Sequence, residues 1–112
     1  MKQVQIIPKA QLDLVALASG RRKEIEQARA GQGAFLVASS GKRGRARTET
    51  WKHRKHPGRV KLVQGMGGVM LAQIIPKADA DEGSEVFGAF MSWLDRNCGE
   101  EILAINVQYR DE

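Results

Sequence analysis

One stretch of the chain, residues 41–61, is far more basic than the rest and most constrains how the chain can fold. It holds nine of the eighteen lysines and arginines, both histidines and a single acid, Glu49. Lysine and arginine are almost never fully buried without a partner, so most of this stretch has to lie at the surface. The rest of the chain has nine basic and twelve acidic side chains, so the basicity is local.

Length and composition bound the class of protein. A chain of 112 residues with 42% apolar and 28% charged residues is typical of one folded globular domain, which we expect to span residues 1–112. The single cysteine, Cys98, cannot form an internal disulfide. The first residues lack the unbroken apolar run of a signal peptide, and no stretch reaches the ~18 apolar residues of a membrane span. We therefore expect a cytoplasmic protein with no membrane partner.

Four segments have the pattern of core strands: residues 2–7, 34–39, 69–75 and 102–109. The first and last alternate with a period of two, whereas the middle two are short apolar runs bounded by glycine or proline, which is typical of buried strands. The sequence QIIPKA occurs at residues 5–10 and again at residues 73–78, each time at a strand end. Chance and duplication both account for so short a repeat.

Two segments have a helical period. In residues 84–98 the side chains of Phe87, Phe90, Met91 and Leu94 fall on one face, with Ser84 as the predicted N-cap and an αL-type stop at residues 97–99. Residues 9–30 are interrupted near Gly20 and fit either one kinked helix or two short ones. The second half has too few apolar residues for a recognition helix, which disfavours a helix-turn-helix motif.

The order strand, helix, strand, strand, helix, strand predicts an α+β fold of the ferredoxin-like type. This split βαβ sandwich packs two helices on one face of an antiparallel sheet. The basic arm and hairpin at residues 41–64 then become an insertion between the second and third core strands.

Within this insertion, residues 48–56 are expected to pair with residues 59–64 across Pro57 and Gly58. A loop of two or four residues gives the same register, with Arg54 opposite Lys61 and His56 opposite Arg59, and it also sets Lys52 opposite Val63. Five basic side chains then share one face: Lys52, Arg54, His56, Arg59 and Lys61. Trp51 lies on the other face, toward the domain. The glycine-rich segment before the hairpin is predicted to be a flexible arm that carries Lys42, Arg43, Arg45 and Arg47.

Like charges opposite each other destabilise a hairpin, so this arrangement predicts a polyanionic partner. Clustered lysine and arginine bind nucleic-acid phosphates by releasing counterions, and a two-stranded ribbon fits a major groove. The predicted DNA or RNA contacts are Lys42, Arg43, Arg45, Arg47, Lys52, Arg54, His56, Arg59 and Lys61. Trp51 can stack on a base, although a core role is favoured. The alternatives are a solvated hairpin that protects a sheet edge, neutralisation by the acidic C-terminal third, and an acidic protein partner.

No phosphate-binding loop, dinucleotide fingerprint or cysteine pair is present, so we expect no cofactor. His53, His56, Arg54 and Tyr109 are the candidates for a metal-independent endoribonuclease. The two histidines fall on opposite faces of the predicted strand with no carboxylate to orient them, which argues against catalysis and against a metal site. We expect a non-catalytic protein, and a homodimer because a second copy can cover an exposed sheet edge.

Overall fold

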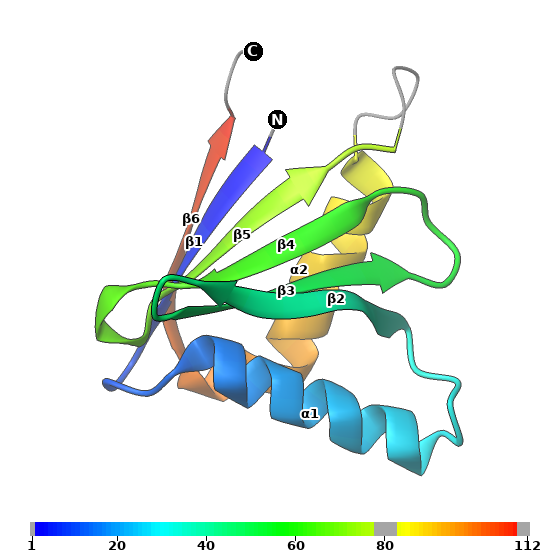
Figure 1. The fold of residues 1–112 in the computed structure, drawn as a ribbon, viewed down its shortest axis with the longest axis horizontal. Helices are drawn as coiled ribbons and strands as arrows, with labels where there is room; N and C mark the ends of the chain where they lie inside the picture. Colours follow the sequence, from blue (N-terminus) through cyan, green and yellow to red (C-terminus); the bar gives the residue numbers. More distant parts are fainter. Residues whose placement is uncertain (1, 78–82, 110–112) are drawn as a thin grey trace.

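Six strands and two helices make up this computed structural model, which describes residues 2–77 and 83–109 (Figure 1). In chain order they are β1 (Lys2–Pro8), α1 (Leu14–Ala28), β2 (Phe35–Arg43), β3 (Ala46–His53), β4 (Arg59–Gln64), β5 (Met70–Ile75), α2 (Ser84–Cys98) and β6 (Ile102–Tyr109). Short 3₁₀ turns at Met66–Gly68 and Gly99–Glu101 follow β4 and α2. The predicted α+β class is confirmed.

The strands form one open antiparallel sheet in the order β2-β3-β4-β5-β1-β6. β2 to β5 follow one another as a meander, and β1 lies between β5 and β6 (Figure 1). β3 and β4, predicted to form an inserted hairpin, are therefore integral central strands. The finer ferredoxin-like arrangement stays a prediction.

Both helices pack on the same face of the sheet, which is where the core lies. In β5 the side chains of Met70, Ala72 and Ile74 are buried and alternate with partly exposed ones. Buried residues of α1 and α2 join the same cluster. Its centre is aromatic: the rings of Phe35, Phe90, Trp51 and Trp93 lie 5.1 to 6.5 Å apart between centroids. Trp51 is completely buried, so the core role holds and base stacking by this residue is excluded.

The opposite face of the sheet carries no helix, and we call it the open face. Residues paired directly across two strands share a face, so the register defines its members. It comprises Gln3, Gln5, Ile7, Leu36, Ser39, Gly41, Arg43, Ala46, Thr48, Thr50, Lys52, Arg59, Lys61, Val63, Leu71, Gln73, Ile75, Ala104, Asn106 and Gln108.

The helix ends differ from the sequence expectation. α1 runs through Gly20 as one helix, so no helix-turn-helix forms there, and it begins at Leu14 because the Asp13 side chain accepts a hydrogen bond from the Ala16 amide at 3.1 Å. The N-cap of α2 is Gly83 rather than Ser84. A Cβ at Gly83 would lie 2.9 Å from Ile74, and its φ of 75° favours glycine. Gly99 has a right-handed φ of −55°, so the predicted αL stop is wrong.

The two segments predicted to be buried strands, residues 34–39 and 69–75, differ from each other in burial. β5 is central and has a buried face, whereas β2 is an edge strand in which only Phe35 is buried. The prediction that residues 34–39 form a buried strand is therefore wrong.

The two QIIPKA copies lie in the neighbouring strands β1 and β5, with Gln5 and Gln73 both on the open face. The last residue of the second copy lies outside the described residues. Neither α1 nor α2, the helices of the described chain, is long and apolar enough to cross a membrane.

Candidate nucleic-acid interface

The pairing of β3 with β4 sets the positions of the basic side chains. Lys52 lies opposite Arg59, Thr50 opposite Lys61 and Thr48 opposite Val63. The predicted register, with Arg54 opposite Lys61, His56 opposite Arg59 and Lys52 opposite Val63, is therefore wrong. The connection between the strands is longer than predicted and covers residues 54–58.

Hydrogen bonds at the end of β3 explain the longer connection. The Arg54 guanidinium donates to the carbonyls of Gly31 and Gly33 and pairs with the Glu26 carboxylate of α1 at 2.6 Å. The His53 Nδ1 accepts the backbone amides of Lys55 at 3.0 Å and His56 at 3.2 Å. These contacts turn the chain out of the ladder directly after His53.

The register error leaves the two faces intact, because it shifts the pairing by an even number of residues and side chains alternate with a period of two. Lys52, Arg59 and Lys61 still share a face, and it is the open face. Trp51 and Val60 lie on the buried face, as expected. Arg54 and His56 do not join the three cations, because both lie in the connection and have acidic partners of their own.

The predicted flexible arm is instead the end of a β-hairpin. Residues 41–43 are the last part of β2 and pair with β3. A two-residue turn at Gly44 and Arg45 joins the strands, and the Gly44 φ of 65° suits a hairpin turn of this length. Arg43 lies on the open face, whereas Lys42 and Arg47 lie opposite each other on the other face. The arm prediction is wrong because the ladder continues to Arg43.

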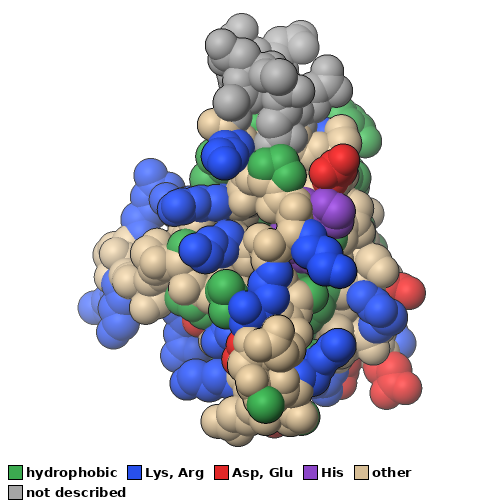
Figure 2. Space-filling model, turned by 90° about the vertical axis from the view of Figure 1, so that its right-hand side faces the viewer, with side chains coloured by type: hydrophobic (Ala, Val, Ile, Leu, Met, Phe, Trp, Pro, Cys, Tyr) green, Lys and Arg blue, Asp and Glu red, His purple; other side chains and the backbone are tan. Residues whose placement is uncertain are grey.

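The open face carries positive charge and no described acid. The acids of the described chain all lie elsewhere: Asp13, Glu24, Glu26, Glu49, Glu85, Asp95, Glu100 and Glu101. Within residues 2–77 and 83–109, no carboxylate forms an ion pair with Lys52, Arg59 or Lys61. Figure 2 shows many Lys and Arg side chains over the end of the molecule with the β3–β4 connection, and acids mostly toward one edge.

Three of the acids outside the open face have basic partners of their own. Arg21 of α1 pairs with Glu101 at 2.8 Å, and its hydrogen bond to that carboxylate lowers the pKa of Glu101. Glu26 pairs with Arg54, and Glu85 of α2 lies 3.2 Å from His56. Among the described acids, internal neutralisation therefore applies to Arg54 and His56, and it does not extend to Lys52, Arg59 or Lys61.

Glu49 is the one acid of the basic stretch, and it does not neutralise that surface. Its side chain is on the helical face and is only 8% exposed. One carboxylate oxygen accepts from the Ser19 hydroxyl at 2.6 Å, and the other accepts from the Trp51 indole N–H at 2.9 Å. Glu49 thus ties β3 to α1. This contact could have been predicted from the position of Glu49 two residues before Trp51, because residues two apart on a strand lie on the same face.

The two histidines are stacked, with ring centroids 4.6 Å apart and an interplanar angle of 23°. The prediction that they point to opposite faces of a strand is wrong, because His56 has left the strand. The prediction that no carboxylate orients the histidines is also wrong, since the Glu85 carboxylate lies beside the His56 Nδ1. Burial, and then the charges of His56 and Lys55, lower the pKa of His53. Because its Nδ1 accepts two amides, the ring is neutral with its proton on Nε2.

Protonation of His53 is expected to destabilise the fold. Because its folded pKa lies below the ordinary 6.5, the unfolded chain takes up the proton first as the pH falls. Stability is then present above that value and is lost as the pH falls toward the folded pKa. Asn at position 53 keeps an acceptor near the Nδ1 position and does not titrate. Denaturant melts at pH 7.5 and about pH 5.5 should show a smaller loss for His53→Asn than for wild type; equal losses would contradict this.

Removal of Arg54 is expected to affect stability rather than ligand binding. Arg54→Ala removes an ion pair and the donors to two carbonyls, so we expect a loss of about 1–2 kcal/mol for this partly exposed group. Lys55→Ala is the matched control in the same connection and should change stability by less than about 0.5 kcal/mol. Urea denaturation measures both. Equal stabilities of the two variants would show that the Arg54 contacts contribute nothing.

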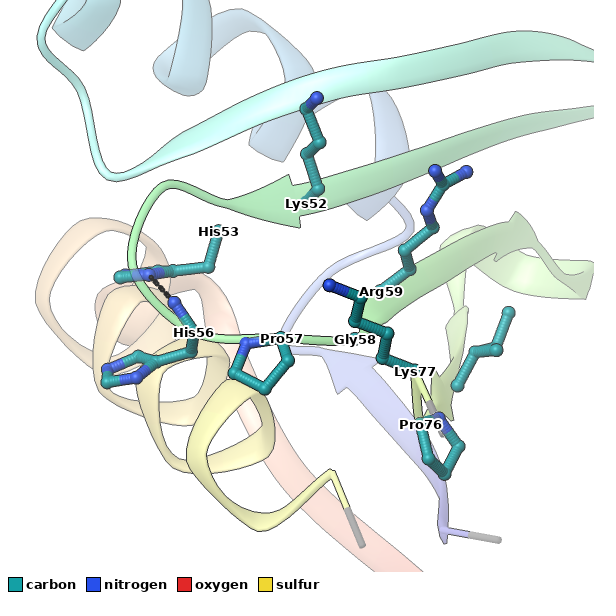
Figure 3. A pocket seen from close by; sticks show the side chains of 9 residues that line it. Lys52, His53, His56, Pro57, Gly58, Arg59, Pro76 and Lys77 are labelled. Carbon is teal, nitrogen blue, oxygen red and sulfur yellow. Dashed lines mark hydrogen bonds between the residues drawn. The ribbon is translucent and has the colours of Figure 1, made fainter. Parts of the chain in front are cut away.

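A hollow of about 420 Å³ lies at one end of the open face (Figure 3). The β3–β4 connection and the end of β5 form its walls. The lining residues are Lys52, His53, His56, Pro57, Gly58, Arg59, Ile75, Pro76 and Lys77. This hollow could not be predicted from the sequence, because residues 75–77 meet the basic stretch only through the β4–β5 pairing.

The described residues contain no group of three or more His, Cys, Asp or Glu side chains able to hold a metal ion. The comparisons give no family assignment: no protein-family model, curated protein sequence or solved structure matches this chain significantly.

Proposed function

We propose that this protein binds nucleic acid through the open face, without catalysis. The observation that supports it most is the direct opposition of Lys52 and Arg59, with Lys61 beside them, on a face that has no described acid. Like charges placed opposite each other lower the stability of a sheet. A bound polyanion removes that cost, and it is the ligand that this surface fits best.

The spacing of the three cations suits successive phosphates. Cross-strand neighbours such as Lys52 and Arg59 are roughly 5 Å apart at their Cβ atoms. Arg59 and Lys61, two residues apart on β4, are separated by about 7 Å. Side chains of this length reach neighbouring phosphates of one strand. Toward β1 and β6 the same face presents the amides of Gln3, Gln5, Gln73 and Asn106, which can donate to phosphate or sugar oxygens.

The contacts of the proposed interface are to the backbone of a duplex rather than to unstacked bases. No member of the open face is aromatic, and both tryptophans are buried. Binding of single strands relies on aromatic stacking, which this face does not offer. The hairpin end with Arg43 and Arg45 extends the cationic surface beyond the sheet, and both remain proposed contacts together with Lys42 and Arg47.

Salt titration tests this proposal. We expect the wild-type protein to bind duplex DNA or structured RNA with an affinity that falls steeply with added salt, as measured by fluorescence anisotropy of a labelled duplex. Absorbance at 260 nm in freshly purified protein should reveal co-purified nucleic acid. Absence of duplex binding at low ionic strength would contradict the proposal, and a stable complex with an acidic protein would favour the protein-interaction alternative.

Catalysis is tested separately. The His56–Glu85 contact is the one observation that favours the endoribonuclease alternative. RNA incubated with wild type and with the His53→Ala, His56→Ala double variant should stay intact in both samples under our proposal. Cleavage by wild type alone would replace binding by catalysis as the function.

We also propose that a second copy pairs with β6. This edge strand has no charged residue between Ile102 and Tyr109, and it exposes 67% of Leu103 and 36% of Ile105. Protected edges usually carry charge, as the other edge does at Lys42 and Arg43. Antiparallel β6–β6 pairing would join two open faces in one sheet.

The proposed dimer is tested by light scattering after gel filtration. Wild type should have the mass of a dimer, and Ile105→Lys should have that of a monomer because it places like charges across the two-fold axis. Val37→Lys on the β2 edge is the matched control and should stay dimeric. A monomeric wild type at high concentration would contradict the proposal.

A further inference from the structure

Four side-chain amides form a group on the open face, next to its cations. Gln5 of β1 lies opposite Asn106 of β6, and Gln3 of β1 lies opposite Gln73 of β5. We call these four residues the amide cluster. Gln73 in turn lies opposite Lys61 of β4. Because residues paired across strands are about 5 Å apart, the amide cluster continues the polar surface from the cations across β5, β1 and β6.

The amide cluster is accessible to a ligand. Its members are partly or fully exposed, and within the described part of the chain their side chains form no hydrogen bond with the protein. Each amide offers two N–H donors and one carbonyl acceptor. The best partner for such a surface is a group that both donates and accepts, and a hydroxyl is a group of this kind.

The shape of the open face decides how it can meet a duplex. Both helices lie on the other side of the sheet (Figure 1), so the cations and the amide cluster are carried by adjacent strands of a sheet surface. The major groove of B-DNA admits a helix or a two-stranded ribbon. The minor groove of A-form RNA is wide and shallow and displays the 2′-hydroxyls. A sheet surface can therefore meet this RNA groove without a protruding element.

The end of the β2–β3 hairpin is narrow enough for a groove of DNA, but it lies away from the amide cluster. Gly44 and Arg45 form its turn, at the β2 edge of the sheet. In the strand order β3 and β1 are separated by three strand spacings, a distance of about 14 Å. A duplex held by the hairpin end alone would leave the amides of β1 without a contact.

We propose that the open face prefers duplex RNA to duplex DNA, because the amide cluster forms hydrogen bonds with 2′-hydroxyls in the shallow groove. Lys52, Arg59 and Lys61 hold phosphates beside that groove. DNA lacks the hydroxyl and keeps only the phosphate contacts. The inference rests on the proposed function and adds the class of nucleic acid.

Fluorescence anisotropy with labelled duplexes of one sequence, made of RNA, DNA or 2′-O-methyl RNA, tests the inference. RNA should bind at least about tenfold more tightly than DNA at the same salt, which corresponds to one or two neutral hydrogen bonds. The 2′-O-methyl duplex has no hydroxyl donor and should lose most of this preference. Equal binding of RNA and DNA, or of RNA and 2′-O-methyl RNA, would overturn the inference and leave the proposed function standing. Absence of binding to all three at low salt would contradict both.

A pair of substitutions separates the amide cluster from the cations. Gln5→Val, Gln73→Val removes two amides and keeps residue types that suit a strand. The ratio of RNA affinity to DNA affinity should fall toward one, and the salt slope should stay, because a neutral amide releases no counterions. The control Gln27→Ala, Gln32→Ala removes two exposed amides away from the open face and should keep the ratio. An unchanged ratio in the first variant would overturn the inference.

The NMR signals of the side-chain NH₂ groups provide a measurement on the wild-type protein. Duplex RNA should shift those of Gln5, Gln73 and Asn106 more than duplex DNA does, and it should leave those of Gln27 and Gln32 in place. Binding of RNA without shifts in the amide cluster would overturn the inference.

Discussion

The triple variant Lys52→Ala, Arg59→Ala, Lys61→Ala is expected to lose a large part of the salt dependence of duplex binding. Each phosphate that a cation neutralises contributes about 0.9 to the slope of log affinity against log salt on B-DNA. Removal of three such contacts should therefore flatten the slope by about 2.7 and weaken binding most at low salt. Anisotropy titrations at several salt concentrations measure both effects.

A matched control separates these contacts from net charge. Lys23→Ala, Arg29→Ala, Arg96→Ala removes the same charge from the helical side of the molecule. This variant should keep nearly the wild-type slope, since its cations lie away from the open face. Equal flattening in the two triple variants would mean that the protein attracts nucleic acid by overall charge, without a defined interface.

The open-face variant should also keep its stability. Lys52 and Arg59 repel each other across the ladder, so their replacement is expected to leave the free energy of unfolding unchanged or to raise it by a few tenths of a kcal/mol. Charged residues that lower the stability of a fold are commonly retained because they serve its function.

The largest effect on stability is expected from Trp51→Ala, with a loss of about 3–5 kcal/mol. The side chain is completely buried among Phe35, Phe90 and Trp93, and its removal leaves a cavity at the centre of the core. It also removes one of the two donors to the buried Glu49 carboxylate. Chemical denaturation measures the loss.

The variant Trp51→Phe tests the contribution of the indole N–H separately from that of the ring volume. It keeps most of the ring volume and removes the indole N–H, so we expect a smaller cost of about 1–3 kcal/mol. Duplex binding by the folded Trp51→Phe protein should equal that of wild type. A selective loss of binding with stability intact would contradict the core assignment of Trp51.

Periodicity alone was sufficient to locate most of the secondary structure. The strands at residues 2–7, 69–75 and 102–109 and the helix from residue 84 all appear where alternation or helical spacing placed them. The exposure of β2 could not be predicted in this way, because an edge strand and a central strand can both have a short apolar run in the sequence. What distinguishes them is the number of neighbours, which only the strand order provides.

The candidate interface was predictable by face and not by register. Alternation alone separated Lys52, Arg59 and Lys61 from Trp51, and that separation survives any even shift. The register depended on the length of the connection, and this was set by Arg54 reaching Gly31 and Gly33, residues far away in the sequence. The partners of His56 and Glu49, on α2 and α1, were hidden for the same reason.

The most direct test of the central claim is methyl NMR of the protein with and without duplex DNA. On the open face, Thr48, Thr50, Val63 and Leu71 provide methyl reporters, whereas Leu17 and Ile25 of α1 report on the helical side. Binding through the open face predicts that duplex DNA shifts the first group and leaves the second in place. Shifts confined to the helical side, or no shifts at low salt, would contradict it.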